Sequence, residues 1–200
     1  MDAARYCVGI DLGTTNCALA FVDMAQPEEA RAAEVLPIPQ LVAAGELAER
    51  SVLPSFIYLP EAHEVVADTL KLPWQAEAPD LAVGAYARSL ASEVPGKIVA
   101  SAKSWLCCET VDRRSACLPW DSGDVPRQIS PVDAARLLLE HLRDAWNWKM
   151  AAEDPSLRLE EQDVILTVPA SFDAISRELT AEAARAAGLN ARLFEEPQAA

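Results

Sequence analysis

Residues Val8–Asp23, with the sequence VGIDLGTTNCALAFVD, carry the strongest structural signal in this chain. Two short apolar runs, at 6–10 and 17–22, flank a polar turn that contains Gly13. Apolar runs of this length, bounded by turn residues, are typical of buried strands. Glycine supplies the backbone freedom that a tight turn needs. We therefore predict a β-hairpin at the start of the chain.

The turn of this hairpin brings a carboxylate close to two hydroxyl groups. Asp11 ends the first strand and suits a hydrated magnesium ion, which prefers few carboxylates and several waters. Backbone N–H groups across Gly13–Asn16 can form an anion-binding nest, and Thr14 and Thr15 add side-chain donors. An ordinary β-turn favours the same residue types, so both interpretations stay open on these residues alone. The chain contains neither GxxxxGK[ST] nor GxGxxG.

Downstream, helical and strand patterns alternate. Ser130, Pro131 and Asp133 suit the start of a helix, which runs to about residue 150 with one apolar face. Strand hairpins followed by alternating helices and strands predict an α/β layered fold. Before this helix we expect a strand near 35–38, a strand within 52–59, a surface insertion at 60–80, helices at 84–93 and 97–106, and an irregular segment at 107–129. After it we expect a strand at 163–168, a helix and a strand from 191. Ser171 would cap that helix and Gly188 would end it, and its inward side chains would be Phe172, Ile175, Leu179, Ala183 and Ala186.

Composition excludes several classes of protein. The formal net charge is −14, with 31 acidic and 17 basic residues, which does not suit a nucleic-acid binder. No signal peptide and no apolar run of membrane-spanning length are evident, so we expect a cytoplasmic protein without a membrane partner. The five cysteines lack disulfide-like or CxxC spacing, so free thiols are favoured over a metal cluster at Cys107, Cys108 and Cys117.

Two segments resemble a known family. GIDLGTTN, at 9–16, is similar to the first phosphate motif of the actin-like ATPase superfamily, which includes heat shock protein 70 chaperones, actins and sugar kinases. Residues 163–200 are similar to the chaperone family in particular: Val-Pro-Ala-Ser-Phe, Ala-Ala-Gly-Leu and Glu-Pro-x-Ala-Ala occur in that order. A looser match covers 53–55 and 95–106. The resemblance is weakest at 24–50 and 107–129.

The resemblance implies the fold and the division of the chain. It implies an α/β lobe of the actin-like (ribonuclease H-like) ATPase type, with a mixed β-sheet, packed helices and an inserted smaller α+β subdomain. Subdomain IA would span about 1–36 and 125–200, and subdomain IB about 37–124. The opposing lobe and any peptide-binding domain would lie outside the chain, so we expect these 200 residues to be inactive alone and to expose an apolar face where that lobe would pack.

The resemblance also implies the site and its ligands, ATP or ADP and magnesium. Asp11 and Glu196 would be carboxylates that hold magnesium through water, and Gly13, Thr14, Thr15 and Asn16 would form the phosphate loop. Two departures affect the last motif: Glu195 stands where asparagine is common, and Gln198 where threonine is usual.

In this family a lysine of the inserted subdomain points at the γ-phosphate. Two residues compete for that place. Lys71 has a suitable distance from Pro54, but Pro73 and Pro79 suggest an insertion there. Arg88 follows a Val-Gly pair and has a suitable distance to Pro95, so we predict that Arg88 is the catalytic cation. Arginine stays charged and can grip phosphate oxygens bidentately.

The resemblance favours an ATP-binding lobe of an atypical chaperone of the stress response. Its longer parent would hydrolyse ATP and act on client polypeptides or with co-chaperones. Two alternatives stay open: a non-catalytic, nucleotide-switched scaffold on the same fold, and a sugar-kinase-type enzyme of the same superfamily. Fold alone does not decide among them.

Overall fold

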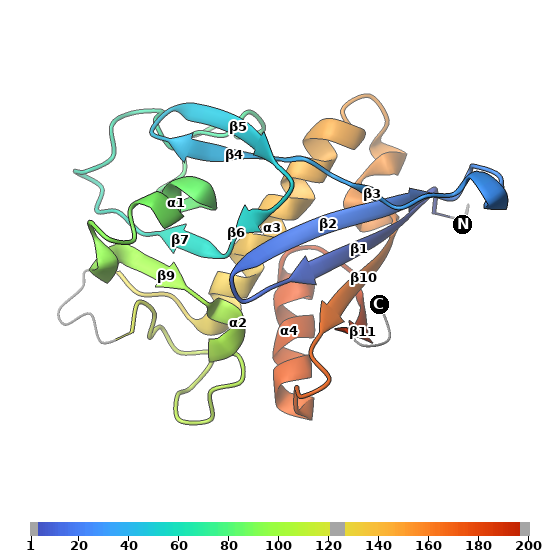
Figure 1. Ribbon diagram of the computed structural model, residues 1–200. Helices are drawn as coiled ribbons and strands as arrows, with labels where there is room; N and C mark the ends of the chain where they lie inside the picture. Colours follow the sequence, from blue (N-terminus) through green and yellow to red (C-terminus); the bar gives the residue numbers. More distant parts are fainter. Residues whose placement is uncertain (1–3, 121–126, 197–200) are drawn as a thin grey trace.

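The computed structural model describes residues 4–120 and 127–196. Its main sheet has the strand order β11-β10-β1-β2-β3, with β6 also pairing with β2 (Figure 1). β1 runs parallel to β10 and antiparallel to β2, and β10 runs parallel to β11. The strands are β1 (Tyr6–Leu12), β2 (Asn16–Asp23), β3 (Glu34–Val35), β6 (Leu53–Pro54), β10 (Asp163–Val168) and β11 (Arg192–Glu195).

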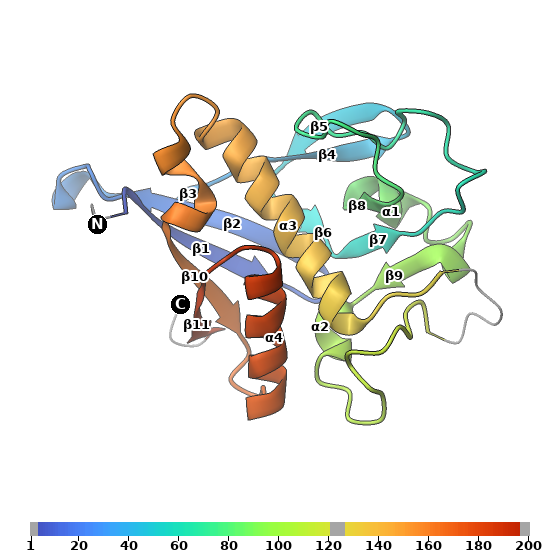
Figure 2. The same ribbon diagram turned by 180° about the vertical axis from the view of Figure 1, so that it is seen from behind.

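Two long helices cover one face of this sheet. α3 (Pro131–Met150) and α4 (Ala174–Ala186) lie side by side on this face, in front of the strands in Figure 2. Alternate residues of β1, among them Val8 and Ile10, are fully buried beneath them, because side chains along a strand point to opposite faces. Trp146 of α3 is also fully buried and meets the ring of Tyr6 edge-on at 5.4 Å.

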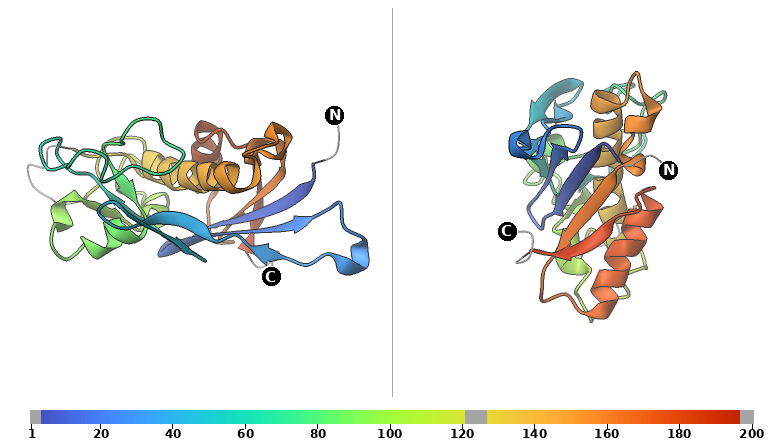
Figure 3. Two further views of the ribbon diagram at one scale, coloured as in Figure 1. Left: turned by 90° about the horizontal axis from the view of Figure 1, so that it is seen from above. Right: turned by 90° about the vertical axis from the view of Figure 1, so that its right-hand side faces the viewer.

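The segment between β3 and α3 forms a second group of elements. A hairpin of β4 and β5 and a small sheet of order β8-β7-β9 pack with the short helix α1, and the short helix α2 packs against α3. Seen from above, this group extends from one end of the main sheet (Figure 3). Its elements are β4 (Ile38–Ala43), β5 (Glu46–Arg50), β7 (Phe56–Tyr58), β8 (Ala82–Val83), α1 (Ala85–Ser89), β9 (Ile98–Ala100) and α2 (Ala102–Trp105); single 3-10 turns occupy Glu28–Ala30, Pro95–Lys97, Pro155–Leu157 and Leu159–Glu161.

The main predictions about the fold are confirmed. The α/β class, the first hairpin and the strand at 163–168 are all present. Ser130 caps α3 by accepting a hydrogen bond from the Asp133 N–H at 2.9 Å. Gly188 ends α4 at a φ of 78°, and the Leu189 N–H bonds back to the Ala184 carbonyl at 2.9 Å. That pattern is a Schellman motif.

Other predictions about elements are wrong. A strand, β9, replaces the first half of the helix expected at 97–106, because Ile98 and Val99 are buried in the pairing with β7 and branched side chains suit that setting. The helix expected at 84–93 is only five residues long. The single strand expected near 35–38 is divided between β3 and β4, and β5 pairs with β4.

The start of α4 also differs from expectation. Asp173, not Ser171, caps the helix by accepting from the Ser176 N–H at 2.7 Å. Leu179 and Ala183 of α4 are buried as expected, but Ile175 and Ala186 face solvent. Ser176 and Ala187, each one residue further along the chain, are buried in their place.

Candidate functional site

The candidate site lies where the parallel strands of the main sheet end. Asp11 is the register partner of Thr167 in the neighbouring strand β10, so both side chains leave the same face of the sheet. The Thr167 hydroxyl lies 3.3 Å from Asp11 Oδ1. This face is the one that α3 and α4 leave uncovered. In open α/β sheets, ligands bind outside the carboxyl ends of the strands.

The turn between β1 and β2 is fixed by close backbone contacts. A Cβ atom added to Gly13 would lie 2.1 Å from the Asn16 carbonyl oxygen, so only glycine fits. Ser55 supports the turn from the start of the second group of elements: its hydroxyl donates to the Gly13 carbonyl at 2.7 Å, and its N–H donates to the Thr15 carbonyl at 2.9 Å. Thr14 and Thr15 face solvent beside Asp11.

Polar atoms beneath the turn are buried. Asn16 Oδ1 is buried and has no hydrogen-bond partner among residues 4–120 and 127–196. The Cys17 thiol lies 3.3 Å from the Ser55 hydroxyl, and burial raises the pKa of Cys17 to about 11. Cys17 therefore stays a neutral thiol and takes part in packing, while the exposed upper side of the turn carries the threonine hydroxyls.

Lys103 is the cation of this site. It lies in α2, and its side chain is 9% exposed. Its ammonium donates to Glu196 Oε1 at 2.7 Å and lies 4.0 Å from Asp11 Oδ1. The Phe172 ring lies on another side, with its centroid 6.0 Å from the Lys103 nitrogen. One buried positive charge therefore connects the two carboxylates that the resemblance singles out.

Glu195 carries the extra charge that departs from the family pattern, and a cation neutralises it. Arg177 of α4 donates to Glu195 Oε1 at 2.6 Å and to the Phe172 carbonyl at 3.1 Å. Glu195 therefore does not compete with Glu196 for Lys103. Gln198 lies outside the described residues.

Arg88 and Lys71, the two cations considered from the sequence, lie elsewhere. Arg88 is exposed on α1, which packs against β4 and β7. Lys71 lies in the loop between β7 and β8. Within residues 4–120 and 127–196, neither forms an ion pair with Asp11 or Glu196, whereas Lys103 is within ion-pair distance of both. From the sequence only Arg88 and Lys71 were considered for this place, on their distances along the chain; the Ser-Ala-Lys context of Lys103, after the buried Ile98 and Val99, was the available signal.

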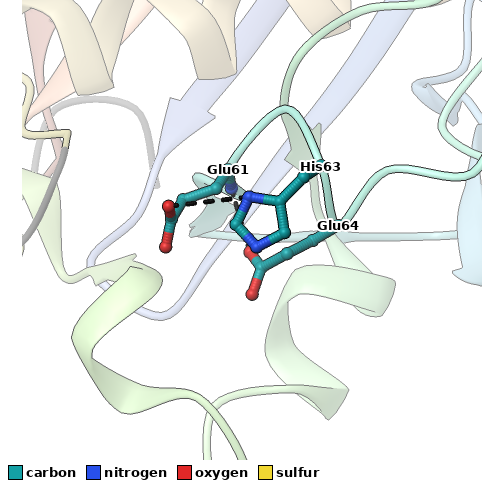
Figure 4. Close-up of side chains that lie close together, drawn as sticks. All are labelled: Glu61, His63 and Glu64. Carbon is teal, nitrogen blue, oxygen red and sulfur yellow. Dashed lines mark hydrogen bonds and ion pairs between the residues drawn. The ribbon is translucent and has the colours of Figure 1, made fainter.

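One other group of side chains has the composition of a metal site. Glu61, His63 and Glu64 bring three ligand atoms within 4.8 Å of one another, the only such group in the described part of the chain (Figure 4). The Lys97 ammonium already pairs with both carboxylates, at 3.1 Å from Glu61 and 2.5 Å from Glu64. A metal ion there would have to displace this lysine. The three cysteines considered from the sequence do not form such a group among the described residues.

No helix in the described residues is long and apolar enough to cross a membrane.

Comparison with known proteins gives relatives that carry a chaperone name. No family model matches the chain. A chaperone protein HscA homolog from Bordetella petrii is 30% identical over 206 aligned residues, and one from Burkholderia orbicola is 33% identical over 208. In both comparisons the alignment covers 98% of this chain and 27% of the relative, so the chain spans about a quarter of their length. This similarity supports a relationship to the heat shock protein 70 family.

Proposed function

We propose that this chain is the part of a heat shock protein 70-like chaperone that binds the phosphates of ATP. The observation that carries the proposal is Lys103, buried between Asp11 and Glu196 beside the Gly13 turn. A buried cation held between two carboxylates at the end of a sheet is a candidate for a functional site. The relatives named HscA support a chaperone over a sugar kinase.

The residues present fit a polyphosphate with its metal. A Cβ at Gly13 would collide with the Asn16 carbonyl oxygen, so the tight turn that presents the backbone N–H groups depends on this glycine. Thr14 and Thr15 present donors, and Lys103 supplies a positive charge. Asp11 and Glu196, with side chains 55% and 44% exposed, would hold magnesium through water. When bound, magnesium would neutralise charge on the phosphate oxygens.

Lys103 takes the role that the sequence had suggested for Arg88. Its ammonium would stabilise negative charge on the terminal phosphate, and its burial strengthens that interaction relative to a solvated cation. Glu196 keeps the ammonium oriented in the absence of phosphate. Hydrolysis itself is proposed for a longer parent protein, since catalysis of phosphoryl transfer depends on groups positioned around the transferred phosphate.

The test is titration of the 200-residue chain with ATP and magnesium, and with tripolyphosphate, by calorimetry. Lys103→Ala is expected to weaken binding at least about tenfold, the effect of losing roughly 1.4 kcal/mol. Lys103→Arg should retain most of the affinity. Arg88→Ala and Lys71→Ala are matched controls that should bind like the original chain.

Two results would contradict the proposal. One is the absence of binding by the original chain at millimolar nucleotide. The other is unchanged binding by Lys103→Ala together with a loss in Arg88→Ala, which would restore the assignment made from the sequence. Gly13→Ala provides an independent check, because its Cβ would collide with the Asn16 carbonyl and should abolish binding at the turn.

A further inference from the structure

The loop that follows α2 holds two adjacent thiols directly after the lysine of the site. Cys107 is exposed, and its Sγ lies 3.7 Å from the Lys103 carbonyl oxygen, to which it donates. Cys108 is half-buried and turns in another direction, toward Thr110. The two cysteines are therefore adjacent in the chain, but their sulfur atoms have different surroundings.

The surroundings of Cys108 favour a negative sulfur. Its Sγ lies 3.2 Å from the Thr110 hydroxyl. The backbone of Thr110 and of Val111 contributes to the same effect on the Cys108 thiol. Together with the charge of Arg113, these contacts lower the pKa of Cys108, with the Thr110 hydroxyl as the largest cause. Thiolate, rather than thiol, is the reactive form of cysteine.

Arg113 supplies an independent observation. It is 9% exposed, and its Nε donates to the Cys108 carbonyl at 2.9 Å. Its Nη1 is buried and finds no hydrogen-bond partner in the part of the chain that the structure describes. Across the described residues no carboxylate lies within ion-pair distance of this guanidinium, and Asp173 interacts with it only at longer range, so the buried charge beside Cys108 has no directly paired anion. An unpaired buried charge is costly, and an anionic sulfur nearby would offset that cost.

The other half-buried or buried thiols differ. Burial raises the pKa of Cys7, Cys17 and Cys117, with a value of about 11 for Cys17. Cys107 is more exposed than Cys108, but its sulfur faces the Lys103 carbonyl and has no hydroxyl beside it among the contacts of the described residues. Exposure alone would make Cys107 the more reactive thiol, whereas the polar surroundings favour reaction at Cys108.

We propose that Cys108 is a modification site that forms a mixed disulfide with a small disulfide of the glutathione class. The Cys108 sulfur attacks one sulfur of the small disulfide and forms the new S–S bond. The old S–S bond breaks, and its electron pair leaves with the other half as a thiolate, which takes up a proton from water. Cys108 is oxidised, and the small disulfide is the oxidant.

The modification would also act on the nucleotide site, a consequence that rests on the proposed function. α2 is four residues long and holds Lys103, and Cys107 bonds to the carbonyl of that residue. An adduct on Cys108 displaces the adjacent Cys107 and with it the end of this short helix. Lys103 would lose its alignment with Asp11 and Glu196, so phosphate affinity is expected to fall several-fold on modification.

The test uses the 200-residue chain and glutathione disulfide at pH 7, with intact mass and peptide mapping as readouts. One adduct is expected, on Cys108. Cys108→Ser should abolish it, and Cys107→Ser, the adjacent and more exposed thiol, should leave its rate unchanged. Thr110→Val keeps the shape of the side chain and removes the hydroxyl, so it should slow the reaction and move the midpoint of its pH dependence upward.

The outcomes separate this proposal from the one about function. An adduct on Cys107, or equal labelling of several cysteines, would overturn the assignment of Cys108, as would an unchanged rate in Thr110→Val. Reduction with dithiothreitol should reverse the adduct and any loss of tripolyphosphate affinity. If the adduct forms on Cys108 but the original chain does not bind tripolyphosphate, the modification site stands and the proposed function fails.

Discussion

His141 illustrates how burial changes the behaviour of a single side chain. It lies in α3, 5% exposed, with its Nε2–H donating to the Pro39 carbonyl at 2.9 Å and the Trp74 ring packed edge-on at 5.5 Å. Burial lowers the pKa of His141 to about 4, from the usual 6.5. The ring is therefore neutral in the folded protein at neutral pH and joins α3 to the strand β4.

This shift predicts a loss of stability in acid. Between pH 6.5 and pH 4 the unfolded chain binds a proton at His141 that the folded chain does not, so the free energy of unfolding falls as the pH falls through that window. The decrease from this residue should be about 3 kcal/mol between pH 7 and pH 4. Urea unfolding at several pH values measures it.

His141→Gln is the control for that measurement, because glutamine can donate to the same carbonyl and does not titrate. Its stability should decline less steeply across the window. Asp144, whose pKa is raised mainly by burial, acts in the opposite direction in both proteins. Parallel curves for the original chain and His141→Gln would show that His141 does not titrate as described.

Helix ends are the elements for which local chemistry gives the clearest expectation. Ser130 and Asp133 bond reciprocally: the Ser130 hydroxyl accepts from the Asp133 N–H at 2.9 Å and donates to Asp133 Oδ2 at 2.7 Å. Ser130 is 3% exposed. The cap therefore satisfies a donor that would otherwise be buried without a partner at the start of the longest helix.

Ser130→Ala should lower the free energy of unfolding by about 1 kcal/mol, within the range of roughly 0.5–2 kcal/mol for loss of a cap. Ser171→Ala is the matched control. The sequence suggested Ser171 as the cap of α4, but the structure assigns that role to Asp173 and leaves Ser171 exposed. Chemical denaturation of both variants measures the difference. An equal loss in Ser171→Ala would show that α4 begins earlier than described.

The elements also show what could be predicted from the sequence. The first hairpin, α3 and β10 have complete local signals, namely turn residues, a cap and an uninterrupted apolar pattern. Lys103 could not be placed in this way, because its position depends on the pairing of β9 with β7, a contact between segments about 40 residues apart. Asp11 and the Gly13 turn are local features, whereas the meeting of Asp11, Lys103 and Glu196 is a property of the tertiary fold.

At the scale of the whole molecule, α3 and α4 cover only one face of the main sheet within the described residues. The other face has a hollow of about 390 Å³ whose lining is mostly apolar, including small residues such as Gly9, Ala18 and Ala20 and the large ring of Phe194. Phe194 is 42% exposed. Exposed apolar patches favour association.

We therefore expect the 200-residue chain to bind an apolar dye and to associate as its concentration rises, as measured by fluorescence and analytical ultracentrifugation. Phe194→Ser should reduce both signals. Ile175→Ser is the control, since Ile175 is 59% exposed on α4, which packs on the covered face. A chain that stays monomeric without binding dye, or an equal effect of both substitutions, would contradict the expectation.

The pairing of β1 with β10 has a consequence for synthesis on the ribosome. Asp11 and Thr167 are 156 positions apart, yet they are partners in the middle of the sheet. At about 5–20 residues per second, roughly 8–30 s separate the emergence of the two strands. The hairpin of β1 and β2 can form at once, but Ile10 and Leu19 on its inner face remain in contact with water until α3 and β10 have been made. The nascent hairpin is therefore a stage at which this protein would itself need protection from aggregation.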